Sequence, residues 1–141
     1  KYEDGELRYI LAPMGVSEGK RLIASVQASI EPGNNLPLGK IPVGTQIHNI
    51  EIRPGKGAQI VKGAGSVAVV QGKETDYVLL KLPSGEIKRF EYDCWATVGQ
   101  VGNMEARNVR SPKAGTKRRR GIRPSVRGTA QNPRQTQPAA A

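Results

Sequence analysis

Residues 45–71 combine glycines and cations in a pattern that suits contact with a phosphate backbone. Two β-branched runs, residues 47–52 and 67–70, flank a segment that contains a proline, four glycines and three cations. Glycine permits backbone angles closed to other residues and lets a second backbone approach closely, while Arg and Lys neutralise phosphate oxygens. The residues expected to make such contacts are Arg53, Gly55, Lys56, Gly57, Lys62 and Gly65. The alternative is a solvated loop with scattered charges.

A second set of cations lies in residues 113–128, which are too charged and too poor in apolar residues to fold alone. Such segments neutralise phosphates and can order on binding, but they discriminate poorly between nucleic-acid sequences. The cations expected to bind phosphates are Lys113, Lys117, Arg118, Arg119, Arg120, Arg123 and Arg127. A nuclear-targeting run and a solvated disordered tail are the alternatives.

Residues for catalysis or metal binding do not come together in this sequence. His48 lies in an apolar run with no obvious His or Cys partner, and we interpret it as structural. The only cysteine, Cys94, is expected to be a small buried hydrophobe. One Cys and one His cannot build a closed metal site. We therefore expect no enzyme activity, cofactor, metal or small-molecule substrate.

Short strands must position these residues, because turn signals and β-branched runs alternate along the chain. Alternating apolar and polar types in residues 22–30 indicate a half-buried strand. Pro83-Ser84-Gly85 predicts a hairpin turn, and Glu3-Asp4-Gly5 predicts another. The other strands expected are residues 7–12, 47–52, 67–70, 76–82, 86–92 and 95–98, with a linker between two modules at residues 34–42. The sequence therefore predicts an all-β fold.

The positive charge belongs to the C-terminal part of the chain. The 141 residues carry a net charge of +10. Residues 1–98 hold 12 Lys and Arg against 11 Asp and Glu, whereas residues 99–141 hold 10 against 1. A nearly neutral body joined to a strongly basic extension predicts a folded module whose tail binds a polyanion. Glycines and prolines interrupt any amphipathic helix in the tail, so a nucleic acid is expected rather than a membrane.

A series of short motifs follows in a fixed order over roughly residues 3–133. The motifs are LRYILAP at residues 7–13, GNNLPL at 33–38, IPVGT at 41–45, HNIE at 48–51, PGKGAQ at 54–59, AG at 64–65, LPSGE at 82–86, ATVGQVGN at 96–103, KAG at 113–115, GIRP at 121–124 and VRG at 126–128. This series resembles the bacterial-type universal ribosomal protein two family of the large subunit. The resemblance implies the C-terminal part of an oligonucleotide-binding (OB) type barrel in residues 1–37, an SH3-like barrel in residues 38–99 and an extended basic rRNA-binding tail in residues 100–141.

The resemblance also implies a function, that of a structural constituent of the large ribosomal subunit. Such a protein binds large-subunit rRNA near the peptidyl transferase centre, supports its assembly and helps the two subunits associate. The implied partners are large-subunit rRNA and other ribosomal proteins. By the same resemblance, the family's glycine-rich loop corresponds to residues 53–65, and its basic extension to residues 113–127.

Two departures from the family pattern lie at the ends of the chain. The early strands of the first barrel are missing, so we expect upstream residues or a separate chain to complete it. After Pro133, the family's His- and Gly-rich loop is replaced by RQTQP and three alanines. These departures fit an organellar ribosome, a split gene or an incomplete sequence. We expect a mitochondrial ribosome, with the bacterial cytoplasm and the plastid as alternatives.

A different class of function competes with this interpretation. An SH3-like module of a transcription or translation factor would bind another protein and would not need the basic tail, which carries a net charge of +9. An enzyme would need a partner chain to supply its catalytic groups. The tail therefore favours the rRNA-binding interpretation.

Overall fold

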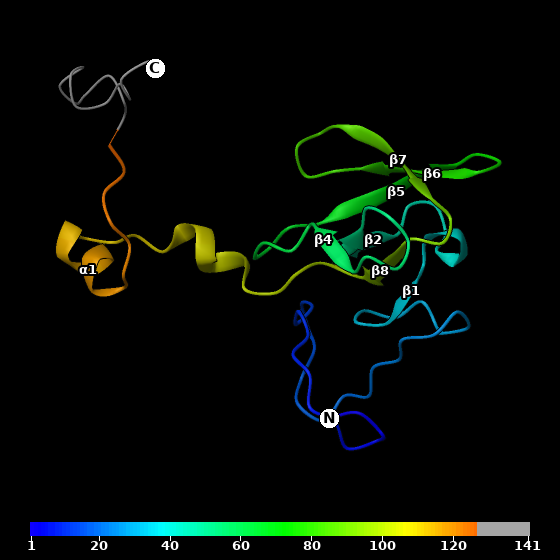
Figure 1. Ribbon diagram of the computed structural model, residues 1–141, viewed down its shortest axis with the longest axis horizontal. Helices are drawn as coiled ribbons and strands as arrows, with labels where there is room; N and C mark the ends of the chain where they lie inside the picture. Colours follow the sequence, from blue (N-terminus) through cyan, green and yellow to red (C-terminus); the bar gives the residue numbers. More distant parts are fainter. Residues whose placement is uncertain (127–141) are drawn as a thin grey trace, which may run out of the picture. The chain divides into compact units, whose positions relative to one another are not determined.

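The computed structural model describes residues 1–126, and the chain divides into two compact units (Figure 1). The first unit spans Lys1–Asn108 and contains every strand of the described chain. The second unit spans Val109–Ala141, of which residues 109–126 are described. The all-β fold predicted from the sequence is confirmed, because antiparallel strands account for most of the regular structure.

The first unit is built on a six-stranded antiparallel sheet. Its strands, in spatial order, are β1 (Asn35–Pro37), β8 (Trp95–Val98), β2 (Gln46–His48), β5 (Ala68–Lys73), β6 (Tyr77–Lys81) and β7 (Ile87–Glu91). The predicted strands at residues 67–70, 76–82, 86–92 and 95–98 are confirmed to within a few residues. A 3-10 helix, η1 (Leu38–Lys40), follows β1.

The hairpin between β6 and β7 confirms the predicted turn at Pro83-Ser84-Gly85. The backbone N–H of Leu82 donates to the oxygen of Glu86 at 2.8 Å, and the N–H of Gly85 donates to the oxygen of Leu82 at 2.9 Å. Gly85 has a φ of 89°, a left-handed conformation that glycine adopts without strain. A three-residue loop that ends in a left-handed glycine is a common hairpin connection, and it fixes the register of the pair.

One hydrophobic core lies against this sheet. Alternate residues of β6, Val78 and Leu80, point into it and are fully buried, as the period of two along a strand requires. Cys94 is part of this core, as predicted, and Phe90 is buried in it. The other buried members are Leu36, Leu38, Ile41, Ile47, Ile50, Ala68, Val70, Ala96 and Val98.

The predicted linker at residues 34–42 is wrong, because this stretch contributes to the sheet and the core. β1 pairs with β8, and the N–H of Leu38 donates to the oxygen of Cys94 at 2.8 Å. Leu36, Leu38 and Ile41 are buried. The two prolines and the glycine suggested a connection, but the apolar residues between them decide the position of the segment.

A second, two-stranded sheet pairs β3 (Ile50–Glu51) with β4 (Ala58–Ile60). The sequence predicted one strand over residues 47–52, whereas the structure divides it at Asn49, which has a φ of 53°. Asparagine tolerates this left-handed conformation better than most residues, and a single such residue redirects the chain. Consequently β2 belongs to the large sheet, whereas β3 and β4 form the base of the glycine-rich segment.

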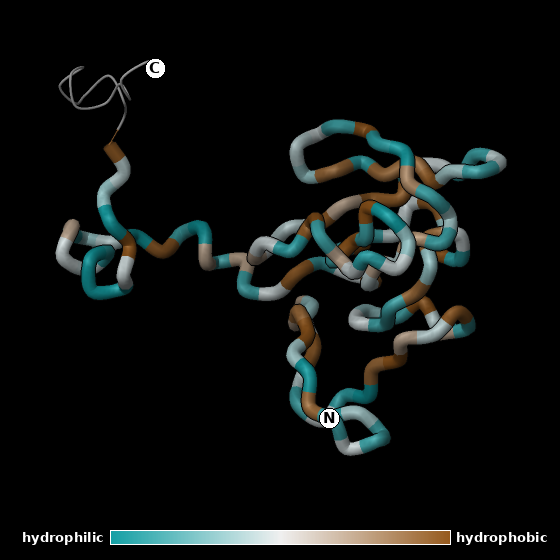
Figure 2. The backbone as a smooth tube through the Cα atoms, viewed as in Figure 1, coloured by the Kyte–Doolittle hydropathy of each residue, from teal (hydrophilic) through white to brown (hydrophobic). Residues whose placement is uncertain are grey.

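The strands predicted at residues 7–12 and 22–30 are wrong. In the described chain these stretches are irregular, and the N-terminal segment joins the sheet region only through isolated bridges, Pro13 with Val101 and Ala24 with Asn35. Figure 2 shows hydrophobic stretches along this segment, and Leu7, Tyr9 and Ile10 are exposed. Apolar alternation alone therefore did not produce a strand here, because a strand also requires a neighbour to pair with.

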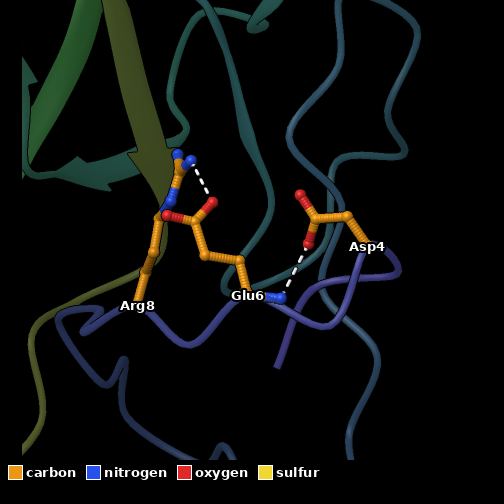
Figure 3. A network of polar contacts seen from close by, with 3 residues as sticks. All are labelled: Asp4, Glu6 and Arg8. Atoms are coloured by element: carbon orange, nitrogen blue, oxygen red, sulfur yellow. Dashed lines mark hydrogen bonds and ion pairs between the residues drawn. The ribbon is translucent and has the colours of Figure 1, made fainter.

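The predicted turn at Glu3-Asp4-Gly5 is confirmed. The N–H of Gly5 donates to the oxygen of Tyr2 at 3.0 Å, and the N–H of Tyr2 donates to the oxygen of Glu6 at 2.9 Å. Figure 3 shows the side chains that close this turn, in which Asp4 Oδ1 accepts from the N–H of Glu6 at 2.9 Å and Glu6 forms an ion pair with Arg8. The turn forms locally because all of its partners lie within a few residues.

Within residues 109–126, the second unit contains one short helix, α1 (Ala114–Arg119), where the sequence predicted an extended tail. The N–H of Gly121 donates to the oxygen of Arg118 at 3.0 Å, and the N–H of Ile122 donates to that of Lys117 at 3.1 Å. With Gly121 at a φ of 79°, these bonds form a Schellman motif, which satisfies the last carbonyl groups of a helix. Gly121 therefore ends a helix that the sequence reasoning did not predict.

Candidate nucleic-acid interface

The loop between β3 and β4 is a tight turn that presents two cations. The N–H of Lys56 donates to the oxygen of Arg53 at 3.3 Å. Pro54 and Gly55 occupy the central positions, and Gly55 has a φ of 75°. Proline followed by a left-handed glycine is the signature of a type II turn. The turn brings Arg53 and Lys56 to adjacent corners, and both side chains are exposed.

Glu51 anchors this loop to the large sheet, a role that the sequence reasoning missed. Its carboxylate is buried and accepts two backbone hydrogen bonds, from Gly57 at 3.0 Å and from Trp95 at 3.0 Å. The first bond holds the end of the loop, and the second holds the start of β8. An acidic residue at the end of an apolar run and beside a glycine-rich turn was the signal available in the sequence.

The second loop, residues 61–67, connects β4 to β5 and begins with a strained residue. Val61 has a φ of 54°, which is rare for a β-branched side chain. Its carbonyl oxygen accepts from the N–H of Asn49 at 2.9 Å, so two left-handed residues face each other. Lys62 follows at the surface, with Nζ 3.4 Å from the oxygen of Ala58.

The three predicted glycines differ in what surrounds them. A Cβ atom added to Gly55 or Gly57 would meet nothing within 4 Å, so both face open space. A Cβ atom on Gly65 would lie 3.1 Å from the Cα of Met104. The N–H of Gly65 also donates to Gly102, and its oxygen accepts from the amide of Gln100 at 2.8 Å. Gly65 therefore packs inside the first unit, whereas the other two glycines leave room for an approaching backbone.

Within residues 52–66, which form these loops, all the charged side chains are cations. Arg53, Lys56 and Lys62 are exposed, and none of them forms a salt bridge within residues 1–126. Residues 52–66 contain no Asp or Glu, whereas residues 71–94 contain five acidic residues and four basic ones. Uncompensated cations attract a polyanion, and nearby carboxylates would repel it. The surface formed by residues 52–66 is therefore better suited to phosphates than the surface formed by residues 71–94.

The tail cations lie in the second unit and are exposed where they are described. Lys113 precedes α1, and three cations fill its last turn, where positive charge interacts favourably with the helix dipole. The exposed members of this group are Lys113, Lys117, Arg118, Arg119, Arg120 and Arg123. Arg127 lies outside the described residues. The structure thus distributes the predicted site residues over two units, each with its own cations.

His48 and Cys94 are both buried in the first unit. His48 Nδ1 lies 2.8 Å from the carbonyl oxygen of Gly99, so this nitrogen carries the proton, and Nε2 has no partner in the described chain. Burial lowers the pKa of His48, an effect that the bond to Gly99 opposes. Burial also raises the pKa of the Cys94 thiol, as does the charge of Glu91. A neutral imidazole and an un-ionised thiol fit the structural roles predicted for both residues.

Within residues 1–126, no group of three or more His, Cys, Asp or Glu side chains could hold a metal ion. None of the helices described is long and apolar enough to cross a membrane.

Comparison with known families agrees with the motif series. Residues 31–138 match the family model described as "Ribosomal Proteins L2, C-terminal domain". The match covers both glycine-rich loops, the large sheet and most of the basic tail, and so extends over more than half of the chain. The chain therefore belongs to the ribosomal protein L2 family and is a structural protein of the large ribosomal subunit.

Proposed function

We propose that this protein binds large-subunit rRNA directly, through the loops at residues 52–66 and through its basic tail. The observation that carries the proposal is the group of three exposed cations with no salt-bridge partner in residues 1–126 and no acidic residue in their loops. Gly55 and Gly57 stand beside two of them and face open space. A phosphate backbone can approach the protein backbone there and be neutralised at the same time.

The two regions contribute by different physical means. In the body, the turn at residues 53–56 is fixed by its own hydrogen bond and by the bond from Gly57 to Glu51, so the backbone that carries its cations is in place before RNA arrives. The tail carries most of the net charge and acts through release of counterions from RNA. Shape complementarity therefore belongs to the body, and most of the salt-dependent affinity belongs to the tail.

The proposed position in the subunit and the proposed domain architecture follow from membership of the family. The proposed position is close to the peptidyl transferase centre, where the protein supports assembly of the subunit, contacts other ribosomal proteins and helps the subunits associate. The proposed architecture is an OB-type barrel that ends in residues 1–37, an SH3-like barrel in residues 38–99 and a tail in residues 100–141. The mitochondrial compartment stays a prediction, and cell fractionation tests it.

The exposed apolar side chains of the N-terminal segment support one further part of this proposal. Leu7, Tyr9 and Ile10 face solvent, although large apolar side chains are favoured in a core. Upstream residues of the same protein or a separate polypeptide would cover them and complete the first barrel. Pull-down of the native protein, followed by intact-mass measurement, tests this; a chain that begins at Lys1 and remains monomeric and soluble would contradict it.

Two matched double variants test the RNA-binding surface. Arg53→Gln with Lys56→Gln removes two cations from the loop, while Lys81→Gln with Lys88→Gln removes two exposed cations from β6 and β7. Both change the net charge equally. If each loop cation contacts one phosphate, the first pair flattens the plot of log affinity for rRNA against log salt by about 1.4 to 1.8, and the second pair leaves it unchanged.

The result that contradicts the proposal is an equal effect of both pairs, which would mean that only net charge matters. Sedimentation of the tagged protein in cells provides the second measurement. Absence from the large subunit, together with stable association with another protein, would favour the protein-binding SH3-like module instead.

A further inference from the structure

Three segments that are distant in the sequence enclose a groove of about 480 Å³ in the first unit. The segments are residues 11–15, residues 62–64 and residues 101–103, which belong to the N-terminal segment, the second glycine-rich loop and the chain after β8. The side chains that line it include those of Pro13, Met14, Lys62, Ala64, Val101 and Asn103. The volume falls within the range of roughly 300–1,000 Å³ that is typical of sites for small organic groups.

Backbone hydrogen bonds hold the walls of this groove in place. The N–H of Gly102 donates to the oxygen of Ala12 at 2.9 Å, and the N–H of Met14 donates to the oxygen of Gln100 at 2.8 Å. The N–H of Gly65 donates to the oxygen of Gly102 at 3.1 Å. This bond joins the glycine-rich loop to residues 101–103. Gly102 allows this approach, because a Cβ atom there would lie 3.0 Å from the oxygen of Ala12.

The lining combines an apolar surface with one cation and one amide. Pro13 and Val101 are buried in the wall, whereas the side chain of Met14 is 54% exposed. Among the described residues that line the groove, Lys62 is the only charged one. Asn103 is exposed and has a φ of 58°, a conformation that asparagine tolerates. An apolar surface beside a cation suits a group that is flat and apolar on its faces and negatively charged at one end.

We propose that this groove receives one unstacked nucleotide of rRNA. The base lies against Met14 and the apolar wall, the Asn103 amide hydrogen-bonds to the base edge, and Lys62 neutralises the adjoining phosphate. Proteins commonly recognise RNA at unpaired bases that are splayed out of a helix, and an amide can both donate to and accept from a base edge. The inference rests on the proposed function, since it names a subsite of the same RNA-binding surface. The absence of acidic residues from the lining favours a nucleotide over a basic peptide.

A variant that fills the groove without changing charge tests the proposal. Ala64→Leu adds apolar bulk inside the groove, and Thr75→Leu adds comparable bulk at an exposed position between Glu74 and Asp76. With in vitro transcribed large-subunit rRNA as the probe, Ala64→Leu lowers affinity about tenfold, the order expected for loss of one stacked base. It leaves the salt dependence unchanged, because it removes no phosphate contact. Thr75→Leu changes affinity by less than about twofold.

Photochemical cross-linking supplies a second measurement that does not depend on the folding of the Ala64→Leu variant. Met14 is replaced by p-benzoylphenylalanine in the full chain, and the adduct with rRNA is mapped by primer extension. One cross-linked nucleotide, unpaired in free rRNA and protected in the complex, is the expected result. Cross-links scattered over many nucleotides, or formed only with a protein in assembled subunits, would overturn the proposal.

The same measurements distinguish a failure of the groove proposal from a failure of the proposed function. If the wild-type chain binds rRNA but Ala64→Leu binds as tightly and the Met14 position gives no single adduct, the groove proposal fails and the proposed function stands. If the wild-type chain does not bind rRNA, both fail. Lys62→Gln gives a further check, since loss of one phosphate contact flattens the salt dependence by about 0.7 to 0.9.

Discussion

Replacement of Glu51 by alanine is expected to destabilise the first unit more than replacement of an exposed acidic residue does. The buried carboxylate accepts hydrogen bonds from the N–H groups of Gly57 and Trp95, each at 3.0 Å. Hydrogen bonds to a charged group contribute about 1.5 to 3 kcal/mol each, and partly buried donors left without a partner remain costly. The two bonds together would give about 3 to 6 kcal/mol, and water that reaches the part-buried donors offsets some of that loss. We therefore expect Glu51→Ala to lower the free energy of unfolding by about 2 to 4 kcal/mol.

Urea denaturation of the full chain, followed by the fluorescence of Trp95, measures this change. Since 1 kcal/mol corresponds to roughly 4–8 °C for a domain of this size, the thermal midpoint should fall by about 8 to 32 °C. Glu51→Gln should lie between the wild type and Glu51→Ala, because the amide keeps one acceptor oxygen and replaces the other with a donor.

The matched control is Glu86→Ala, since Glu86 is exposed in the hairpin between β6 and β7. Surface substitutions of this kind usually change stability by less than about 0.5 kcal/mol. Equal unfolding free energies for Glu51→Ala and Glu86→Ala would refute the view that Glu51 anchors the loop.

Three other predictions concern the tail, the buried histidine and the glycines. Removal of residues 107–141 should leave the body folded and flatten the salt dependence of rRNA binding by roughly four to five, if about six tail cations contact phosphates; equal slopes would show that the tail is solvated. Burial lowers the pKa of His48 below its ordinary value near 6.5, so as the pH falls the unfolded chain binds a proton at His48 before the folded chain does. The contribution of His48 to the free energy of unfolding is therefore fully present above about pH 6.5, and below that pH it falls by at most about 1.4 kcal/mol per pH unit. Thermal melts at about pH 7.5 and about pH 5.5 should show this loss, and His48→Leu should reduce it; an unchanged pH dependence in the variant would assign the effect to other groups. Both Gly57 and Gly65 have a left-handed φ, 82° and 69°, so valine strains the backbone at either position. Gly57→Val should weaken rRNA binding more than Lys56→Ala, whereas Gly65→Val should lower the thermal midpoint further than Gly57→Val because its Cβ would also lie 3.1 Å from the Cα of Met104. If Gly57→Val binds normally while Lys56→Ala abolishes binding, close backbone approach is the wrong mechanism.

The parts of the fold that sequence reasoning predicted are those specified by local signals. Pro83-Ser84-Gly85 sets the β6–β7 hairpin through bonds between neighbours, and the flanking runs pair because the turn brings them together. The family motifs identified the chain as a whole. Residues 22–30 show the limit of such signals, because Val26 and Ile30 fit the alternation that a strand requires yet remain exposed.

The candidate site was predicted in composition but not in geometry. The cations and glycines of residues 53–65 were evident from the sequence, whereas Glu51 was not, because its two hydrogen-bond donors come from different parts of the chain. Similarly, the position of Gly65 against Met104 depends on how the chain returns after β8. These contacts join residues that are distant in the sequence. They follow from tertiary structure, and the spacing of residues within a single segment does not predict them.

The pair of left-handed residues at the base of the β3–β4 hairpin has a consequence for the speed of recognition. Asn49 and Val61 have φ values of 53° and 54°, and a β-branched residue in this conformation costs on the order of 1–3 kcal/mol. The bond from Asn49 to Val61 and the bond from Gly57 to Glu51 offset that strain, so we expect the hairpin to keep one orientation in the free protein. The hairpin loses most of its conformational entropy during folding, so it has little left to lose when RNA binds. In the proposed function, RNA therefore meets a preorganised hairpin, and its association rate is set by encounter and orientation rather than by rearrangement of the loop.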